Sequence, residues 1–147
     1  MKDASNWILT ELYTLLNGVL TYDSVTVPIY AIAESPLDSA NLFVNFSSGY
    51  ITTEIGTKDS FIRPYTVVVD VVSRKQDASL SEREVNFVSN QISSLLKISP
   101  AVLGINGDSE FKVISIDLQD VRSFNDRLED LYHIRKVLNI NFTIKQL

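Results

Sequence analysis

The chain has 147 residues, of which 45% are hydrophobic and 21% charged, and this make-up is typical of an ordinary globular domain with a core. No apolar run approaches the ~18–20 residues of a membrane-spanning helix, the N-terminus lacks a signal-peptide pattern, and the absence of cysteine excludes disulfides and thiol chemistry. A net charge of −5 argues against a protein that grips nucleic-acid phosphates, because such proteins neutralise phosphates with lysine and arginine.

The first predicted element is a helix over residues 5–17. Its core-facing stripe recurs at helical spacing and consists of Ile8, Leu12, Leu15, Leu16 and Val19. We expect Ser5 or Asp3 to cap its start, and Gly18 stands where helices commonly end.

Four β-prone segments follow, of which the one at 50–55 is interpreted as a hairpin arm or an ordered loop. Residues 25–33 predict a strand, and Pro28, which lacks a backbone donor, places that strand at a sheet edge. After a loop at 34–40, residues 42–46 form a second strand with Leu42, Val44 and Phe46 on one face. The most apolar run, 64–72, indicates a central strand that is covered for part of its length on both sides.

A polar, exposed stretch at 73–78 leads into a second helix over residues 80–97. Ser79 and Ser81 each have a glutamate three residues later, which is the pattern of a capping box. The predicted buried stripe of this helix consists of Val85, Val88, Ile92, Leu95 and Leu96.

The last third predicts two strands joined by a charged connection at 122–131. The strand at 111–121 should place Ile114, Ile116 and Leu118 on one side, and the run at 138–145 alternates apolar and polar residues throughout. The predicted fold is a single two-layer α+β domain spanning 1–147, in the order α-β-β-(β)-β-α-β-β. Two main helices would pack on a mainly antiparallel or mixed sheet.

Signals of enzymatic chemistry are weak. The lone histidine, His133, has neither a cysteine nor a second histidine for a zinc site, and no nucleophile motif accompanies it. The five glycines form no phosphate-binding array. We therefore predict no catalytic residue and no cofactor, although a small enzyme built on ordinary carboxylates and tyrosines is an open alternative.

Carboxylates cluster near the C-terminal end of the chain, at Asp117, Asp120, Asp126, Glu129 and Asp130. Oxygen ligands of this kind suit a hard cation, but the spacing is not that of an EF-hand loop, and Arg122 and Arg127 lie among them. Mixed charges on a connection more often form a solvated loop or a subunit contact, so no metal site is predicted.

The order and type of several segments resemble the tail terminator, or tail completion, proteins of long-tailed phages. The segments that carry the resemblance are Leu15-Leu16-Asn17-Gly18, the strand at 25–30, residues 56–60 entering the strand at 65–72, Leu95-Leu96, and the run at 133–142. They are patterns of element order rather than a catalytic signature, and together they cover almost the whole chain.

The resemblance implies a structural virion protein, assembled in the host cytoplasm, that forms a hexameric ring at the tail end or neck. Such a ring would stop growth of the tail-tube protein, join a head–tail connector, and let DNA pass through a lumen without specific binding. The acidic balance suits that lumen. Another neck connector (a stopper or adaptor) and a generic α+β protein-interaction domain are the alternatives.

A ring of identical subunits joins one patch to a different patch on the neighbour. We expect these patches in an arm at 47–63 and in the connection at 122–131. The candidate interface residues are Tyr50, Phe61, Arg63, Arg122, Phe124, Arg127, Glu129 and Asp130. The alternative is that both segments are merely mobile loops.

Overall fold

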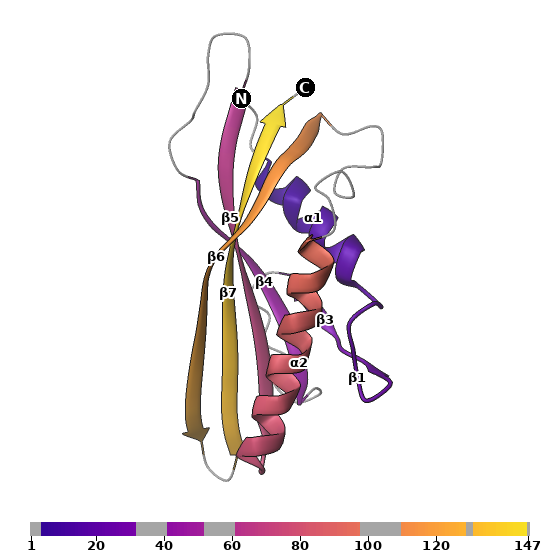
Figure 1. Cartoon of the computed structure of the whole chain (residues 1–147), viewed down its shortest axis with the longest axis vertical. Coiled ribbons are helices and arrows are strands. Elements are labelled where there is room, and N and C mark those ends of the chain that lie inside the picture. The colour runs from indigo at the N-terminus through magenta and orange to yellow at the C-terminus, as the bar shows by residue number, and fades with distance from the viewer. Residues whose placement is uncertain (1–3, 32–40, 52–60, 98–109, 129–130, 147) are drawn as a thin grey trace.

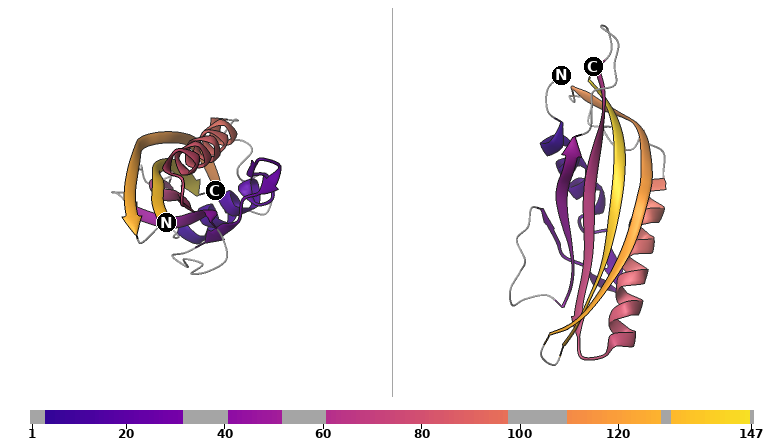
Figure 2. Two further views of the ribbon diagram at one scale, coloured as in Figure 1. Left: turned by 90° about the horizontal axis from the view of Figure 1, so that it is seen from below. Right: turned by 90° about the vertical axis from the view of Figure 1, so that its left-hand side faces the viewer.

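The computed structural model describes residues 4–31, 41–51, 61–97, 110–128 and 131–146 (Figure 1). The helices are α1 (Ser5–Leu16) and α2 (Ala78–Lys97). The strands are β1 (Thr21–Tyr22), β2 (Val25–Thr26), β3 (Ile29–Ala31), β4 (Leu42–Ile51), β5 (Phe61–Lys75), β6 (Phe111–Leu128) and β7 (Leu131–Gln146). Five strands form one sheet in the order β3-β4-β5-β7-β6, and both helices lie on one side of it (Figure 2). The predicted two-layer α+β fold is confirmed.

Three long antiparallel strands form the main part of the sheet. β5 pairs with β7 along its whole length, from Phe61 opposite Gln146 to Lys75 opposite Tyr132. β6 and β7 form a hairpin, β4 runs antiparallel to β5, and the short β3 runs parallel to β4 at the sheet edge. The central position predicted for the strand at 64–72 is therefore confirmed, and so is the edge position that Pro28 indicated.

One hydrophobic core lies between the helices and the sheet. Alternate residues of β5 and β7 face it, and the predicted alternation at 138–145 is confirmed, since Leu138, Ile140, Phe142 and Ile144 are at most 1% exposed. From the helices, the fully buried side chains include Ile8, Leu12, Leu16, Val88 and Ile92. Burial of each such side chain stabilises the fold by roughly 1.5–3 kcal/mol relative to an exposed position. This burial therefore determines which face of the sheet packs against the helices.

The first helix begins at Ser5 as predicted and ends one residue early, at Leu16, but its cap and part of its packing differ. Ala4 precedes it and no side chain caps it, while Asp3 lies outside the described residues. Gly18 has a φ of +77°, a conformation that favours glycine, and the chain turns there so that Leu20 is buried and Val19 is 50% exposed. The predicted place of Val19 in the buried stripe is therefore wrong.

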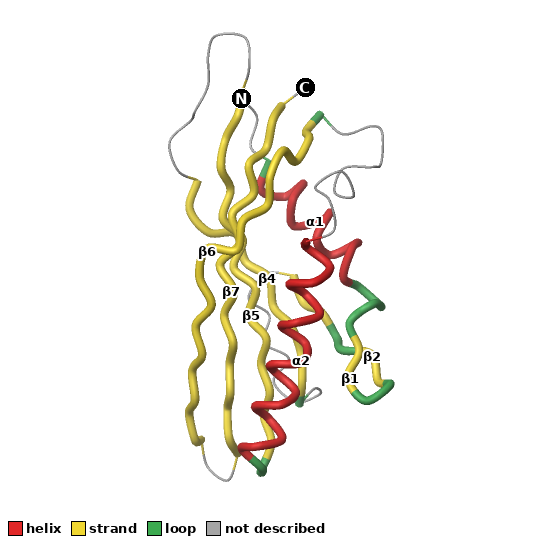
Figure 3. Tube along the Cα trace, viewed as in Figure 1, coloured by secondary structure: helices red, strands yellow, loops and turns green. Residues whose placement is uncertain are grey.

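The predicted strand at 25–33 is broken before Pro28. Its first part pairs with β1 in a small hairpin set apart from the main sheet (Figure 3). Asp23 and Ser24 at the hairpin turn have φ values of 50° and 65°, which match the two left-handed positions of a type I′ turn. The predicted loop at 34–40 lies outside the described residues.

The connection between β5 and α2 corrects two expectations. α2 begins at Ala78, before both serines of the predicted capping boxes, and Asp77 Oδ1 instead accepts bonds from the backbone N–H groups of Ser79 (3.0 Å) and Leu80 (3.4 Å). β5 continues to Lys75, so Ser73 lies fully buried beneath the helix rather than exposed. Asp77 is the better cap because it stands immediately before the first helical residue.

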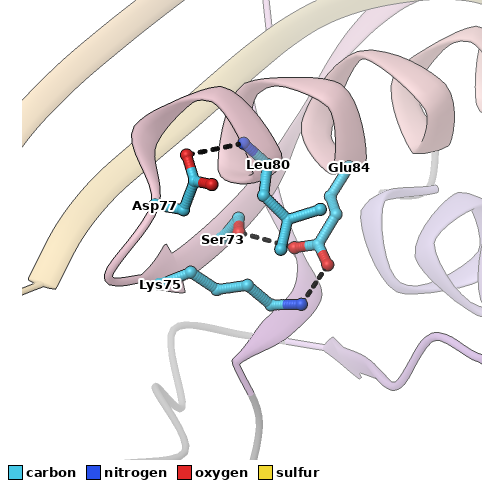
Figure 4. A network of polar contacts seen from close by, with 5 residues as sticks. All are labelled: Ser73, Lys75, Asp77, Leu80 and Glu84. Carbon is cyan, nitrogen blue, oxygen red and sulfur yellow. Dashed lines mark hydrogen bonds and ion pairs between the residues drawn. The ribbon is translucent and has the colours of Figure 1, made fainter.

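A buried carboxylate joins these two elements. Glu84 of α2 is only 2% exposed; Ser73 donates its hydroxyl to Oε2 at 2.8 Å, and Lys75 forms an ion pair with Oε1 (Figure 4). A charge at this depth is tolerated only when it is paired and hydrogen-bonded. The three side chains therefore fix how the start of α2 sits on the end of β5.

The charged connection predicted at 122–131 is mostly strand. β6 runs to Leu128 and pairs continuously with β7 from Asp120 onward. Two register shifts, between Val113 and Ser115 and between Leu118 and Asp120, change which side chains face the helices. Ile116 and Leu118 lie on the face toward the helices, opposite Phe142 and Ile140, whereas Ile114 lies within the first shift and is 43% exposed.

We expect Glu84→Gln to destabilise the fold by about 1–3 kcal/mol, because the substitution leaves Lys75 without its carboxylate in a largely buried site. The midpoint of urea denaturation measures this loss. The matched control is Glu82→Gln, at an exposed position on the same helix, which should leave the midpoint nearly unchanged. Equal midpoints for the two variants would show that the buried ion pair contributes nothing.

Candidate assembly surface

The sheet face opposite the helices is called here the open face. Its described polar, charged and aromatic side chains include Asp70 and Arg74 of β5, His133 and Arg135 of β7, and Asp120, Arg122, Phe124 and Asp126 of β6. The right-hand view of Figure 2 shows this side of the sheet, with both helices behind the strands. Because Val67, Val69 and Val71 of β5 face the core, the residues between them must face outward.

An ion pair joins β5 and β7 on the open face. Arg135 donates to Asp70 Oδ2 from Nη2 at 2.5 Å and from Nε at 3.1 Å, and this hydrogen bonding raises the pKa of Arg135. The same guanidinium lies 5.9 Å from the ring centroid of Phe124 on β6. Arg135 thus links three neighbouring strands and holds one side of the Phe124 ring.

His133 lies in a row across the same three strands. It is opposite Arg74 of β5 and Asp126 of β6. Burial lowers its pKa first, and the positive charges of Arg74 and Arg135 lower it further, against the opposing effect of Asp126 and Asp70. Its Nε2 is buried with no hydrogen-bond partner among the described residues. Neutral imidazole is therefore the form that this surface favours.

One corner of the open face is covered. Phe43 of β4 and Val72 of β5 are 1% and 3% exposed although they point away from the main core. Tyr30 meets Phe43 edge-on at 6.0 Å between centroids, and the Arg74 guanidinium lies 5.1 Å from the Phe43 ring centroid. The prediction that β5 is covered on both sides for part of its length is confirmed here.

The terminal segment of β6, residues 120–128, differs from the rest of the sheet. Every residue from 121 to 127 is exposed, on both faces. Phe124 is 46% exposed on the open face, and Val121 is 41% exposed on the face toward the helices. Apolar side chains exposed on both faces of an edge strand are a surface suited to pairing with another strand.

The predicted interface residues fall into two groups. Arg122 and Phe124 lie together on the open face, where Arg122 Nε donates to Asp120 Oδ2 at 2.7 Å. Arg127 points to the opposite face, with its guanidinium 5.4 Å from the Tyr132 ring centroid. The structure therefore divides this group between the two sides of one strand.

The other predicted residues lie far from this segment. Tyr50 lies in β4, while Phe61 and Arg63 lie at the start of β5. Arg63 is nine residues from Val72, the β5 residue level with Phe124, which corresponds to roughly 30 Å along the strand at about 3.3 Å per residue. Glu129, Asp130 and residues 52–60 of the arm lie outside the described residues.

The contribution of β5 and β7 to this surface was not predicted from the sequence. Asp70 interrupts an otherwise apolar strand, and Arg135 stands in the last strand at a position that alternates with buried residues. A charge on each of two long strands was a usable signal, but their register was needed to bring Asp70, Arg135 and Phe124 together. No group of three metal-ligating side chains occurs within the described ranges.

The lowered pKa of His133 predicts a loss of stability on acidification. Above the ordinary histidine pKa of 6.5 the folded and unfolded chains bind the same number of protons at this group, and below it the unfolded chain binds more. Resistance to urea should therefore fall between about pH 7.5 and about pH 5.5, a range above most carboxylate titration. His133→Gln should flatten this dependence; an unchanged dependence in the variant would assign it to other groups.

Comparisons with known proteins give a match in structure alone. No family model matches the chain, and no curated protein matches it in sequence. Solved structures do match: a chain from the virion of a native gene transfer agent particle superposes with a TM-score of 0.61 at 16% identity, covering 97% of this chain and 99% of that one. Within the described part of this chain, no helix has the length and apolar character needed to cross a membrane. The chain thus shares its fold, over nearly its whole length, with a virion component.

Proposed function

We propose that the chain is a non-enzymatic structural virion protein that forms a ring at the tail end or neck of a phage-like particle. The ring stops growth of the tail tube and joins the tail to a head connector, and residues 1–147 act as one domain. The observation that carries the proposal is the end-to-end fold similarity to a component of a gene transfer agent virion.

The shape of the sheet supports assembly into a closed ring. A ring needs two different patches on each subunit, and the two sheet edges differ, since β6 has 18 residues and β3 has three. Residues 61–63 of the arm and residues 122–128 lie toward opposite ends of the long strands. Six copies joined through such unlike patches are the proposed hexamer.

The charge supports a passage for DNA. A net charge of −5 on each copy would make a ring of six strongly acidic, and phosphates would be repelled from its wall rather than retained. DNA would then pass through the lumen without specific binding, while contacts to the tail-tube protein and connector hold the ring in place.

Deletion of the gene tests the position of the subunit. We expect electron microscopy to show filled heads without tails, together with free tails of irregular or excessive length, because nothing would terminate the tube. Tails of normal length that fail to attach would assign the protein to a head-side connector instead. Intact infectious particles would exclude a neck role and favour a generic interaction domain.

Charge reversal tests the proposed contact. Arg122→Glu combined with Arg127→Glu should impair ring assembly while preserving the fold, because both side chains lie on an exposed strand outside the core. Assembly is measured by negative-stain microscopy of purified protein with tail tubes, and folding by circular dichroism. Lys112→Glu, exposed near the other end of β6, is the matched control. Normal rings from the double variant would remove residues 122–131 from the interface.

A further inference from the structure

The terminal segment of β6 has the geometry of a strand that can accept a partner. It is the outermost strand of the five-stranded sheet, and from Asp120 to Leu128 its pairing with β7 continues without a register shift. The side chains at 121–127 are exposed on both faces, so the described structure covers neither side of this edge. Its outward N–H and C=O groups are available to a strand from another molecule.

The order of side chains along this segment is self-complementary. On the open face the residues read Arg122, Phe124, Asp126, so a second copy running antiparallel places Arg122 opposite Asp126 at both ends and Phe124 opposite itself. The nine regularly paired residues are centred on the same phenylalanine. On the other face, Ser123 would lie opposite Asn125, a pair able to hydrogen-bond.

We propose that two copies of the chain pair edge to edge through β6, about a two-fold axis that passes by Phe124. The pair forms a continuous ten-stranded sheet, with two Arg122–Asp126 ion pairs flanking two adjoining aromatic rings. Arg122 keeps enough donors for this contact while bonded to Asp120, because a guanidinium carries five N–H groups.

Neighbouring registers fit less well. A shift of two residues in one direction places Asp120 opposite Asp126, and the opposite shift places Phe124 opposite Asp126. Like charges directly across two strands destabilise a sheet, whereas opposite charges and aromatic pairs stabilise it. The register centred on Phe124 is therefore favoured by its two opposite-charge pairs and its aromatic pair.

This pairing does not depend on the proposed ring. A two-fold contact is complete with two copies, whereas the ring contact continues from copy to copy. If residues 122–131 also serve the ring, the two contacts use the same side chains and exclude one another. Free subunits would then be dimers, and each dimer would have to dissociate before its subunits could join a ring on the tail.

The first test measures the mass of the purified full chain by sedimentation equilibrium over a range of protein concentrations. We expect a species with twice the mass of the 16.5 kDa monomer, and added salt should weaken the association of the two copies. Arg122→Asp or Asp126→Arg alone should raise the dimer dissociation constant about tenfold or more, because each turns two attractions into two repulsions. The double variant Arg122→Asp/Asp126→Arg should restore the dimer, and Lys112→Asp is the control.

The second test uses the absence of cysteine from the chain. Phe124→Cys should give a disulfide-linked dimer under mild oxidation, because the two residues lie directly opposite across the axis, while Lys112→Cys should not. Circular dichroism confirms folding of every variant. A monomeric wild type, a double variant that does not re-form the dimer, or a wild type that sediments as a hexamer would each overturn the two-fold pairing. A wild-type chain that dimerises but forms no ring in particles would count against the proposed function alone.

Discussion

The arrangement of the whole molecule depends on the buried Glu84 carboxylate at the junction of β5 and α2. Only two residues separate the end of the strand from the start of the helix, so α2 must reverse direction and lie back along the sheet. Ser73 and Lys75 hold Glu84 against the end of β5, which commits the helix to the face that carries the valine side chains. The opposite face is left to polar and aromatic contacts across the strands.

That commitment explains why the two faces of the sheet differ so sharply in chemistry. Toward the helices, burial of branched and aromatic side chains supplies the stabilisation. On the open face charged and aromatic side chains are held by pairing across strands, as Asp70, Arg135 and Phe124 are. A face organised in this way keeps these side chains in place without a covering layer of helices.

Much of the fold could be predicted from the sequence because buried faces require apolar residues at regular spacings along the chain. Both helices, the central strand and the alternating last strand follow directly from the spacing of apolar residues. The limits of β6 could not be predicted, because residues 122–127 are exposed on both faces and therefore carry no alternation of buried and exposed side chains. Ser73 was misplaced for a related reason: its burial depends on Glu84, a partner eleven residues away that only the turn brings near.

The candidate surface was predicted in part. Arg122 and Phe124 lie together on the open face, as predicted for a surface group. Arg127 lies on the other face, because the segment is a strand and alternate residues of a strand point in opposite directions. Asp70 and Arg135 were not predicted because the pairing of β5 with β7 sets their relative positions, and the sequence of neither strand alone determines that register.

The full-length pairing of β5 with β7 has a mechanical consequence. Their backbone hydrogen bonds run across the long axis of the sheet, from one end of the pair to the other. A pull along that axis would shear all of these bonds together, whereas a pull across it would open them one after another. The chain is therefore stiffest along its length, and a force applied in that direction meets the greatest resistance to unfolding.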